Sequence, residues 1–138
     1  MKRLIRQVAL AAMMLPNLVC GLELQSGLYV VESRMVLPHL DEMRRIVETR
    51  DICVRSAESL LDFFPVSQQP AMIGCRLVPL DHSKTDFVLR CDAINGAEGH
   101  ASLQLGASHI KGRLEAKMGG KNMTFSQLIK ARRRGNCN

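Results

Sequence analysis

Apolar and polar residues alternate along most of the chain with a period of two, the pattern of half-buried β-strands. The clearest run covers 109–118, where apolar residues and a glycine occupy the even positions and mostly charged residues the odd positions. Antiparallel sheets with one face on the core and the other in water have this pattern. The sequence therefore predicts a strand at 109–118 with a charged outer face.

Six more runs predict strands, each bounded by turn residues. They cover 27 to 35 or 36, 45–54, 75–80, 86–91, about 101–105 and about 122–131. The polar segment 81–85 joins two of them in a hairpin, while Asn95-Gly96 and Gly119-Gly120 mark further turns. The 45–54 segment is the ambiguous one, because residues 42–48 also suit a helix.

One segment has helical spacing instead. Ser56 is a typical N-cap, Leu60, Leu61 and Phe64 follow at helical spacing, and Pro65 is expected to end the helix before a loop at 66–74. The expected fold is mainly β: an antiparallel meander of about seven strands. It forms a curved sheet or incomplete barrel, and the short helix covers its apolar face.

The first 21 residues have the order of a secretory signal. Three bases, Lys2, Arg3 and Arg6, precede an apolar run at 8–15, which is shorter than the roughly 20 residues of a membrane span. We expect cleavage after Gly21, with no transmembrane anchor, leaving residues 22–138 as a single periplasmic or secreted domain. The alternative is lipid attachment at Cys20, although no small residue precedes that cysteine.

Cleavage removes one of five cysteines and leaves Cys53, Cys75, Cys91 and Cys137. In an oxidising compartment paired disulfides are the default. A hairpin that turns near Ser83 places Cys75 opposite Cys91, which leaves Cys53 for Cys137. Four cysteines allow three pairings, and the sequence alone does not decide among them. A zinc or redox site would need a close Cys-x-x-Cys pair, which the chain lacks.

The charge is unevenly distributed. The full chain carries +6, and removal of the first 21 residues leaves 16 bases against 13 acids. Lys111, Arg113 and Lys117 form what we term the basic face, which suits an anionic envelope polymer or an envelope protein. The alternative is an ordinary solvated strand face. Nucleic acid is not expected as a partner, because the chain is exported and no stacking aromatic residues accompany the bases.

No catalytic constellation is visible. Gly-x-Ser-x-Gly is absent, and the segment 119–121 lacks the spacing of a phosphate loop. The histidines do not form a compact metal motif, and the methionines do not form the Met-x-x-Met clusters that suit copper(I). Met118 and Met123 lie on apolar faces, which suggests core packing. We expect a non-catalytic domain without metal or cofactor.

Several short features occur in a familiar order: Gly27-Leu28-Tyr29, Cys53-Val54, Cys75 and Cys91 around a hairpin, Gly99, and Gly135-Asn136-Cys137. This order resembles the family of small exported bacterial proteins called domain of unknown function 3617. Tyr29 stands where that family usually has tryptophan, and the glycine- and methionine-rich later strands are thinner here. The resemblance implies an exported fold of this kind and no assigned activity.

Two roles follow as expectations. The first is an interaction or structural module of the cell envelope that uses the basic face. The second is a carrier of a small apolar ligand, with a pocket between the sheet and the helix that carries Leu60, Leu61 and Phe64.

Overall fold

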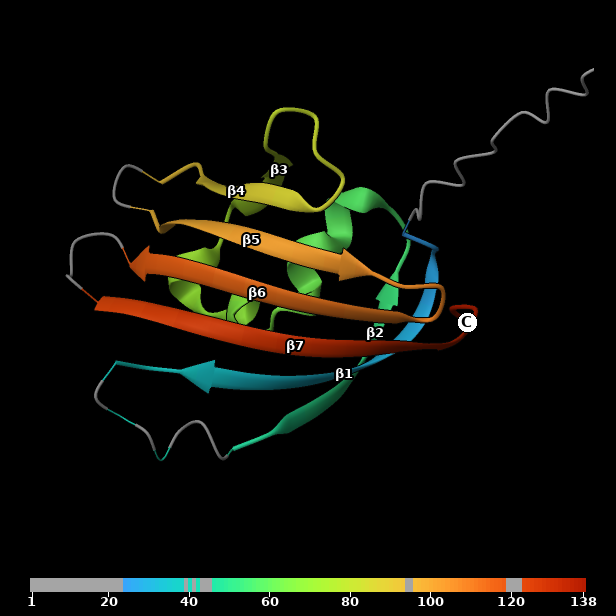
Figure 1. The fold of residues 1–138 in the computed structure, drawn as a ribbon. Helices are drawn as coiled ribbons and strands as arrows, with labels where there is room; N and C mark the ends of the chain where they lie inside the picture. The colour runs from blue at the N-terminus through green and yellow to red at the C-terminus, as the bar shows by residue number, and fades with distance from the viewer. Residues whose placement is uncertain (1–23, 39, 41, 43–45, 94–95, 119–122) are drawn as a thin grey trace, which may run out of the picture.

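The computed structural model describes residues 24–38, 40, 42, 46–93, 96–118 and 123–138. Its strands form one seven-stranded antiparallel sheet, which confirms the expected fold class (Figure 1). The strands are β1 (Gly27–Val36), β2 (Glu48–Val54), β3 (Cys75–Pro79), β4 (Asp86–Cys91), β5 (Glu98–Leu105), β6 (His109–Met118) and β7 (Met123–Gly135). The expected signal peptide at 1–21 lies outside the described residues.

The strand order β2-β1-β7-β6-β5-β4-β3 explains the overall shape. Strands β3 to β7 follow one another as a meander, and β1 then pairs with β7. As a result β2 and β3, which are consecutive in the chain, lie at opposite edges, and the segment that joins them has to cross the sheet. In Figure 1 both edges curl away from the viewer, and this segment lies behind the sheet, inside the half-barrel.

The crossing segment is 3-10 helical. It consists of η2 (Ala57–Phe63), η3 (Pro65–Gln68) and η4 (Pro70–Met72). The expected short helix is present and ends before Pro65, but it is a 3-10 helix and not an α-helix. The prediction of a loop at 66–74 is wrong, because η3 and η4 lie there. Pro65 and Pro70 each begin a new short segment, because proline suits a first helical position but cannot continue the preceding hydrogen bonds. Ser56 occupies the N-cap position without a side-chain capping hydrogen bond. No helix among the described residues is long and apolar enough to cross a membrane.

Two consecutive phenylalanines fill the concave side. Phe63 and Phe64 are both 0% exposed. Phe63 ends η2 and Phe64 is extended, so both side chains reach the core. The ring of Phe63 meets that of Tyr29 edge to face, with centroids 5.2 Å apart. Sequence spacing identified Phe64 and missed Phe63, because it assumed the period of an α-helix.

Three strands differ from their predicted extents by three residues or more. β5 begins at Glu98 and not near Ala101. β2 begins at Glu48, so Ile46 and Val47 lie before it and are exposed. β7 continues to Gly135, and the expected tail after Ala131 therefore begins as paired strand beside β1. The helix alternative at 42–48 and both turn dipeptides fall partly or wholly outside the described residues.

The structure contains the two disulfides that hairpin geometry favoured. Cys75 lies directly opposite Cys91 in the β3–β4 pair, with Cα atoms 4.0 Å apart. Cys53 of β2 bonds to Cys137, with Cα atoms 5.6 Å apart. The Cys53–Cys137 bridge joins the residues after β7 to the edge strand β2. In the sheet, β1 lies between these two strands.

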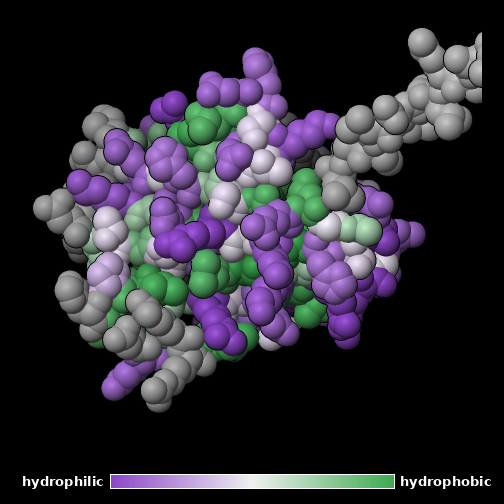
Figure 2. Space-filling model, in the orientation of Figure 1, coloured by the Kyte–Doolittle hydropathy of each residue, from purple (hydrophilic) through white to green (hydrophobic). Residues whose placement is uncertain are grey.

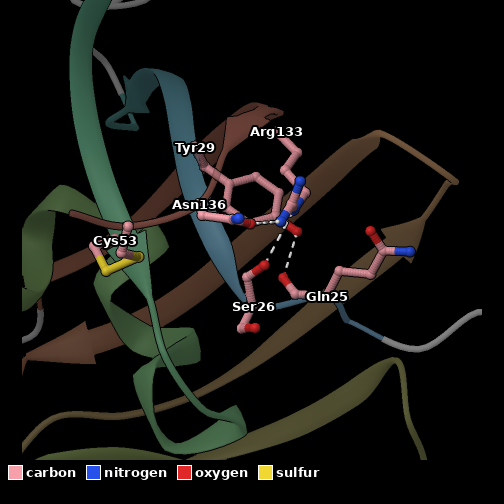
Figure 3. Close-up of a disulfide and its surroundings, with 7 residues drawn as sticks. Gln25, Ser26, Tyr29, Cys53, Arg133 and Asn136 are labelled. Atoms are coloured by element: carbon pink, nitrogen blue, oxygen red, sulfur yellow. Dashed lines mark hydrogen bonds between the residues drawn. A yellow bond between two sulfur atoms is a disulfide. The ribbon is translucent and has the colours of Figure 1, made fainter.

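A group of contacts around this bridge, which we name the C-terminal cluster, holds one end of the half-barrel together (Figure 3). Arg133 Nε donates to the Ser26 carbonyl oxygen at 3.0 Å, and its Nη2 donates to Asn136 Oδ1 at 2.8 Å. The Tyr29 hydroxyl donates to the Gln25 carbonyl oxygen at 2.7 Å. Burial raises the pKa of the Tyr29 phenol, and the charge of Arg133 opposes this shift.

Gly27 is required where the ends of β1 and β7 meet. Its φ of 151° is unfavourable for other residues, and a Cβ there would overlap the Gly135 carbonyl oxygen. The same Cβ would lie 2.6 Å from Arg133 Nε. The first residue of the Gly27-Leu28-Tyr29 motif therefore has to be glycine, so that β1 can approach the end of β7.

We predict that Gly27→Ala lowers the free energy of unfolding by about 1–3 kcal/mol, because the added methyl overlaps backbone and the Arg133 side chain. Gly135→Ala is the matched control, since nothing lies within 4 Å of its Cβ. Urea denaturation of both variants measures the difference. Equal losses in the two variants would contradict the close-approach argument.

The two disulfides should differ in their effect on stability. They close loops of sequence separation 84 and 16. Chain entropy in the unfolded state then assigns about 4.5 kcal/mol to Cys53–Cys137 and about 3 kcal/mol to Cys75–Cys91. Replacing each pair by alanine and comparing urea unfolding tests this order. A larger loss for the shorter loop would contradict it.

Candidate functional site

A cavity of about 550 Å³ opens on the concave side of the half-barrel, at the end opposite the C-terminal cluster. The sheet side of its wall is mainly apolar and comes from β1, β6 and β7. The facing wall comes from η3 and η4, through Pro65, Val66, Pro70 and Ala71. Its volume falls within the range of small-molecule sites, about 300–1,000 Å³.

Three methionines line this cavity: Met35 from β1, Met118 from β6 and Met123 from β7. Met118 and Met123 are direct cross-strand partners. The prediction that both belong to the core is corrected here, since Met118 is only partly buried and Met123 is 51% exposed. Methionine is flexible and polarisable, so such a wall adapts to apolar molecules of different shape.

Two buried polar residues, Ser33 and Gln127, also line the cavity. Each is 3% exposed. Gln127 Oε1 accepts a hydrogen bond from the Val66 backbone N–H at 3.1 Å, which fastens η3 to β7. The Ser33 hydroxyl and Gln127 Nε2 have no protein partner among the described residues.

These two groups must therefore be open to the cavity. No described side-chain nitrogen or oxygen that is sealed from solvent lacks a hydrogen-bond partner. Because Ser33 and Gln127 lie diagonally across the β1–β7 pair, both can contact one ligand. The cavity thus offers two hydrogen-bond donors within apolar walls.

The rim of the cavity is charged. Arg50 of β2 donates through Nη1 to Gln68 Oε1 at 2.9 Å and through Nη2 to Glu48 Oε2 at 3.3 Å. Arg50 and Glu48 both line the cavity, and their side chains are 39% and 56% exposed. The ion pair leaves the rim nearly neutral, so the cavity interior does not face a net charge.

The cavity does not lie where the sequence predicted a ligand pocket, beside η2, but beside the following segments η3 and η4. Leu60, Leu61 and Phe64, which were expected to form one wall, are buried in the core and do not line this cavity. The cavity lies beside the next residues, where the chain turns at two prolines. The side chains of Pro65, Val66, Pro70 and Ala71 that line it are smaller than those of Phe63 and Phe64.

The three bases of the predicted basic face have different neighbours in the sheet. Lys111, Arg113 and Lys117 are all exposed on the outer face of β6, which is turned toward the viewer in Figures 1 and 2. Arg113 pairs with Glu115 on its own strand, and Lys117 lies opposite Glu98 of β5. Lys111 instead lies opposite Lys130 of β7. Sequence reasoning missed Lys130 as a partner because strand order is not visible in the sequence.

The described histidines do not converge. His109 Nδ1 is 2.8 Å from Ser108 Oγ, while His82 lies in the β3–β4 turn with a φ of 61°. His100 is exposed on β5, and His39 lies outside the described residues. Within the described ranges, no three His, Cys, Asp or Glu side chains gather in a way that could hold a metal ion.

No protein-family model, curated protein or solved structure matches this chain. The resemblance to domain of unknown function 3617 accordingly stays a prediction. Function has to be argued from the cavity and the surface themselves.

Gln127→Leu tests the polar floor of the cavity. The change removes the acceptor of the buried Val66 N–H, so we expect the free energy of unfolding to fall by about 1–3 kcal/mol. The exposed Gln104 of β5 is the control, and Gln104→Leu should change stability by less than about 0.5 kcal/mol. Chemical denaturation measures both. A neutral Gln127→Leu would show that η3 is not held by this bond.

Proposed function

We propose that this protein is an exported, non-catalytic domain, periplasmic or secreted, that carries a small apolar ligand in the concave cavity. The observation that carries the proposal is the combination of methionine-rich walls with two polar groups that open into the cavity, the Ser33 hydroxyl and Gln127 Nε2. An apolar pocket with a few convergent polar groups is the usual form of a small-molecule site.

The polar groups indicate the kind of ligand. Gln127 Nε2 can only donate, and the Ser33 hydroxyl can donate as well. Both donors open into the cavity, where the acceptor oxygen of one ligand can bond to them. We infer an apolar chain or ring that bears a carbonyl or carboxylate oxygen.

Binding accounts for the site better than catalysis does. Of the described lining residues only Glu48 and Arg50 are charged, and they pair with each other at the rim. Glu48, the cross-strand partner of Ser33, is ion-paired with Arg50 and makes no hydrogen bond to the Ser33 hydroxyl that would activate it for nucleophilic attack. The lining therefore offers recognition without an acid–base pair.

Export is supported by three features, of which the second and third share the same cysteines. The N-terminal residues have the order of a secretory signal. Two disulfides suit an oxidising compartment. The resemblance to a family of small exported proteins points the same way.

The envelope-interaction role is the second candidate, but its predicted basic face is divided between an ion pair and separate lysines.

Ala71→Trp tests the carrier role by filling the cavity. Ala71 lines the cavity on η4, whereas the exposed Ala93 does not, so Ala93→Trp is the matched control. The chain has no tryptophan, and both variants therefore add the same fluorophore. We expect saturable binding of parinaric acid, a fluorescent fatty acid, to the wild type and Ala93→Trp.

Ala71→Trp should weaken this binding about tenfold or more, which is about 1.4 kcal/mol, because the indole takes up space in the cavity that the ligand needs. Equal affinity in both variants would contradict the cavity as the site. Absence of saturable binding to the wild type would contradict an acyl-type ligand.

A further inference from the structure

A second hollow lies on the outer face of the sheet, on the side opposite the ligand cavity. It has a volume of about 360 Å³ and spans β1, β7 and β6. Three bases from these three strands line it: Arg34, Lys130 and Lys111. All three are exposed, and Leu128 lies among them with 38% exposure.

The strand register brings the three bases together. Lys111 and Lys130 are direct cross-strand partners. Arg34 is the partner of Leu128, which precedes Lys130 by two residues on β7 and therefore faces the same side of the sheet. Like charges directly opposite each other destabilise a sheet. Glu32, the partner of Lys130 on β1, is the one described acid that lines the hollow.

Four of the nine described arginines form ion pairs with carboxylates. Arg50, Arg76, Arg113 and Arg134 each have a carboxylate oxygen within 4.0 Å. Within the part of the chain that the structure describes, Arg34, Lys111 and Lys130 have no such ion pair, and Glu32 pairs with none of them. With three bases against Glu32, the lining of the hollow carries a net positive charge.

We propose that this hollow binds a phosphate group. The planar fork of Arg34 can hold two oxygens of one phosphate, and the two lysines supply point charges from the facing strands. A dianion between Lys111 and Lys130 replaces their repulsion by two attractions. The hollow is large enough for a headgroup, and the exposed Leu128 beside it suits the apolar part of a phosphorylated molecule.

The phosphate group can belong to a free phosphorylated compound or to a phospholipid at a membrane surface. Both present the same oxygens to the bases. The proposal is independent of the apolar-ligand site, because it uses other residues on the other face of the sheet.

The test compares two double variants that lose the same charge. Lys111→Gln/Lys130→Gln removes two bases of the hollow. Arg90→Gln/Lys117→Gln removes two exposed bases from the outer faces of β4 and β6, away from the hollow. Binding is measured at constant ionic strength with inorganic pyrophosphate, and with phosphatidylcholine vesicles that contain or lack phosphatidylglycerol.

We expect the wild type and the control to bind pyrophosphate, anionic vesicles or both, and the Lys111/Lys130 variant to bind about tenfold more weakly. Pyrophosphate binding alone identifies a free phosphate compound, and vesicle binding alone a headgroup. Without any phosphate present, the Lys111/Lys130 variant should melt at the same or a higher temperature than the wild type.

Two results would overturn the proposal. An equal loss in the control would show that only the overall charge attracts anions. No binding of either phosphate source by the wild type would show that the hollow is not a phosphate site.

Discussion

The concave apolar face of an unclosed sheet has to be covered, and Phe63 and Phe64 cover it. β2 and β3 lie at opposite edges, so their connection crosses the half-barrel and carries these two side chains into its centre. In a chain with no tryptophan and four phenylalanines, this pair is a large share of the aromatic core. The curvature of the sheet, the course of the connection and the space left for a cavity all depend on it.

The two ends of the half-barrel differ in how tightly they are packed. At one end the Cys53–Cys137 bridge, Arg133 and Gly27 bring the termini of β1, β2 and β7 into close contact. At the other end η3 and η4 replace the bulky pair with prolines and small residues, and the cavity opens there. The disulfide and the close backbone contacts thus lie at one end of these strands, and the proposed ligand cavity lies at the other.

The sequence predicted what depends on local pattern. Period-two alternation located all seven strands, and a hairpin turn placed Cys75 opposite Cys91. Features that depend on distant pairing were missed: the burial of Gln127, which sits between apolar neighbours on β7, and the meeting of Arg34, Lys111 and Lys130, which needs the strand order. The 3-10 geometry of η2 was missed because Leu60, Leu61 and Phe64 also fit an α-helix.

The most direct test of the carrier role is a native mass spectrum of the protein purified from the cells that produce it, without added ligand. The account predicts a bound apolar molecule with a carbonyl or carboxylate group, lost from Ala71→Trp and kept by Ala93→Trp. A clean mass of the unliganded wild type, under conditions that preserve the fold and both disulfides, would contradict it.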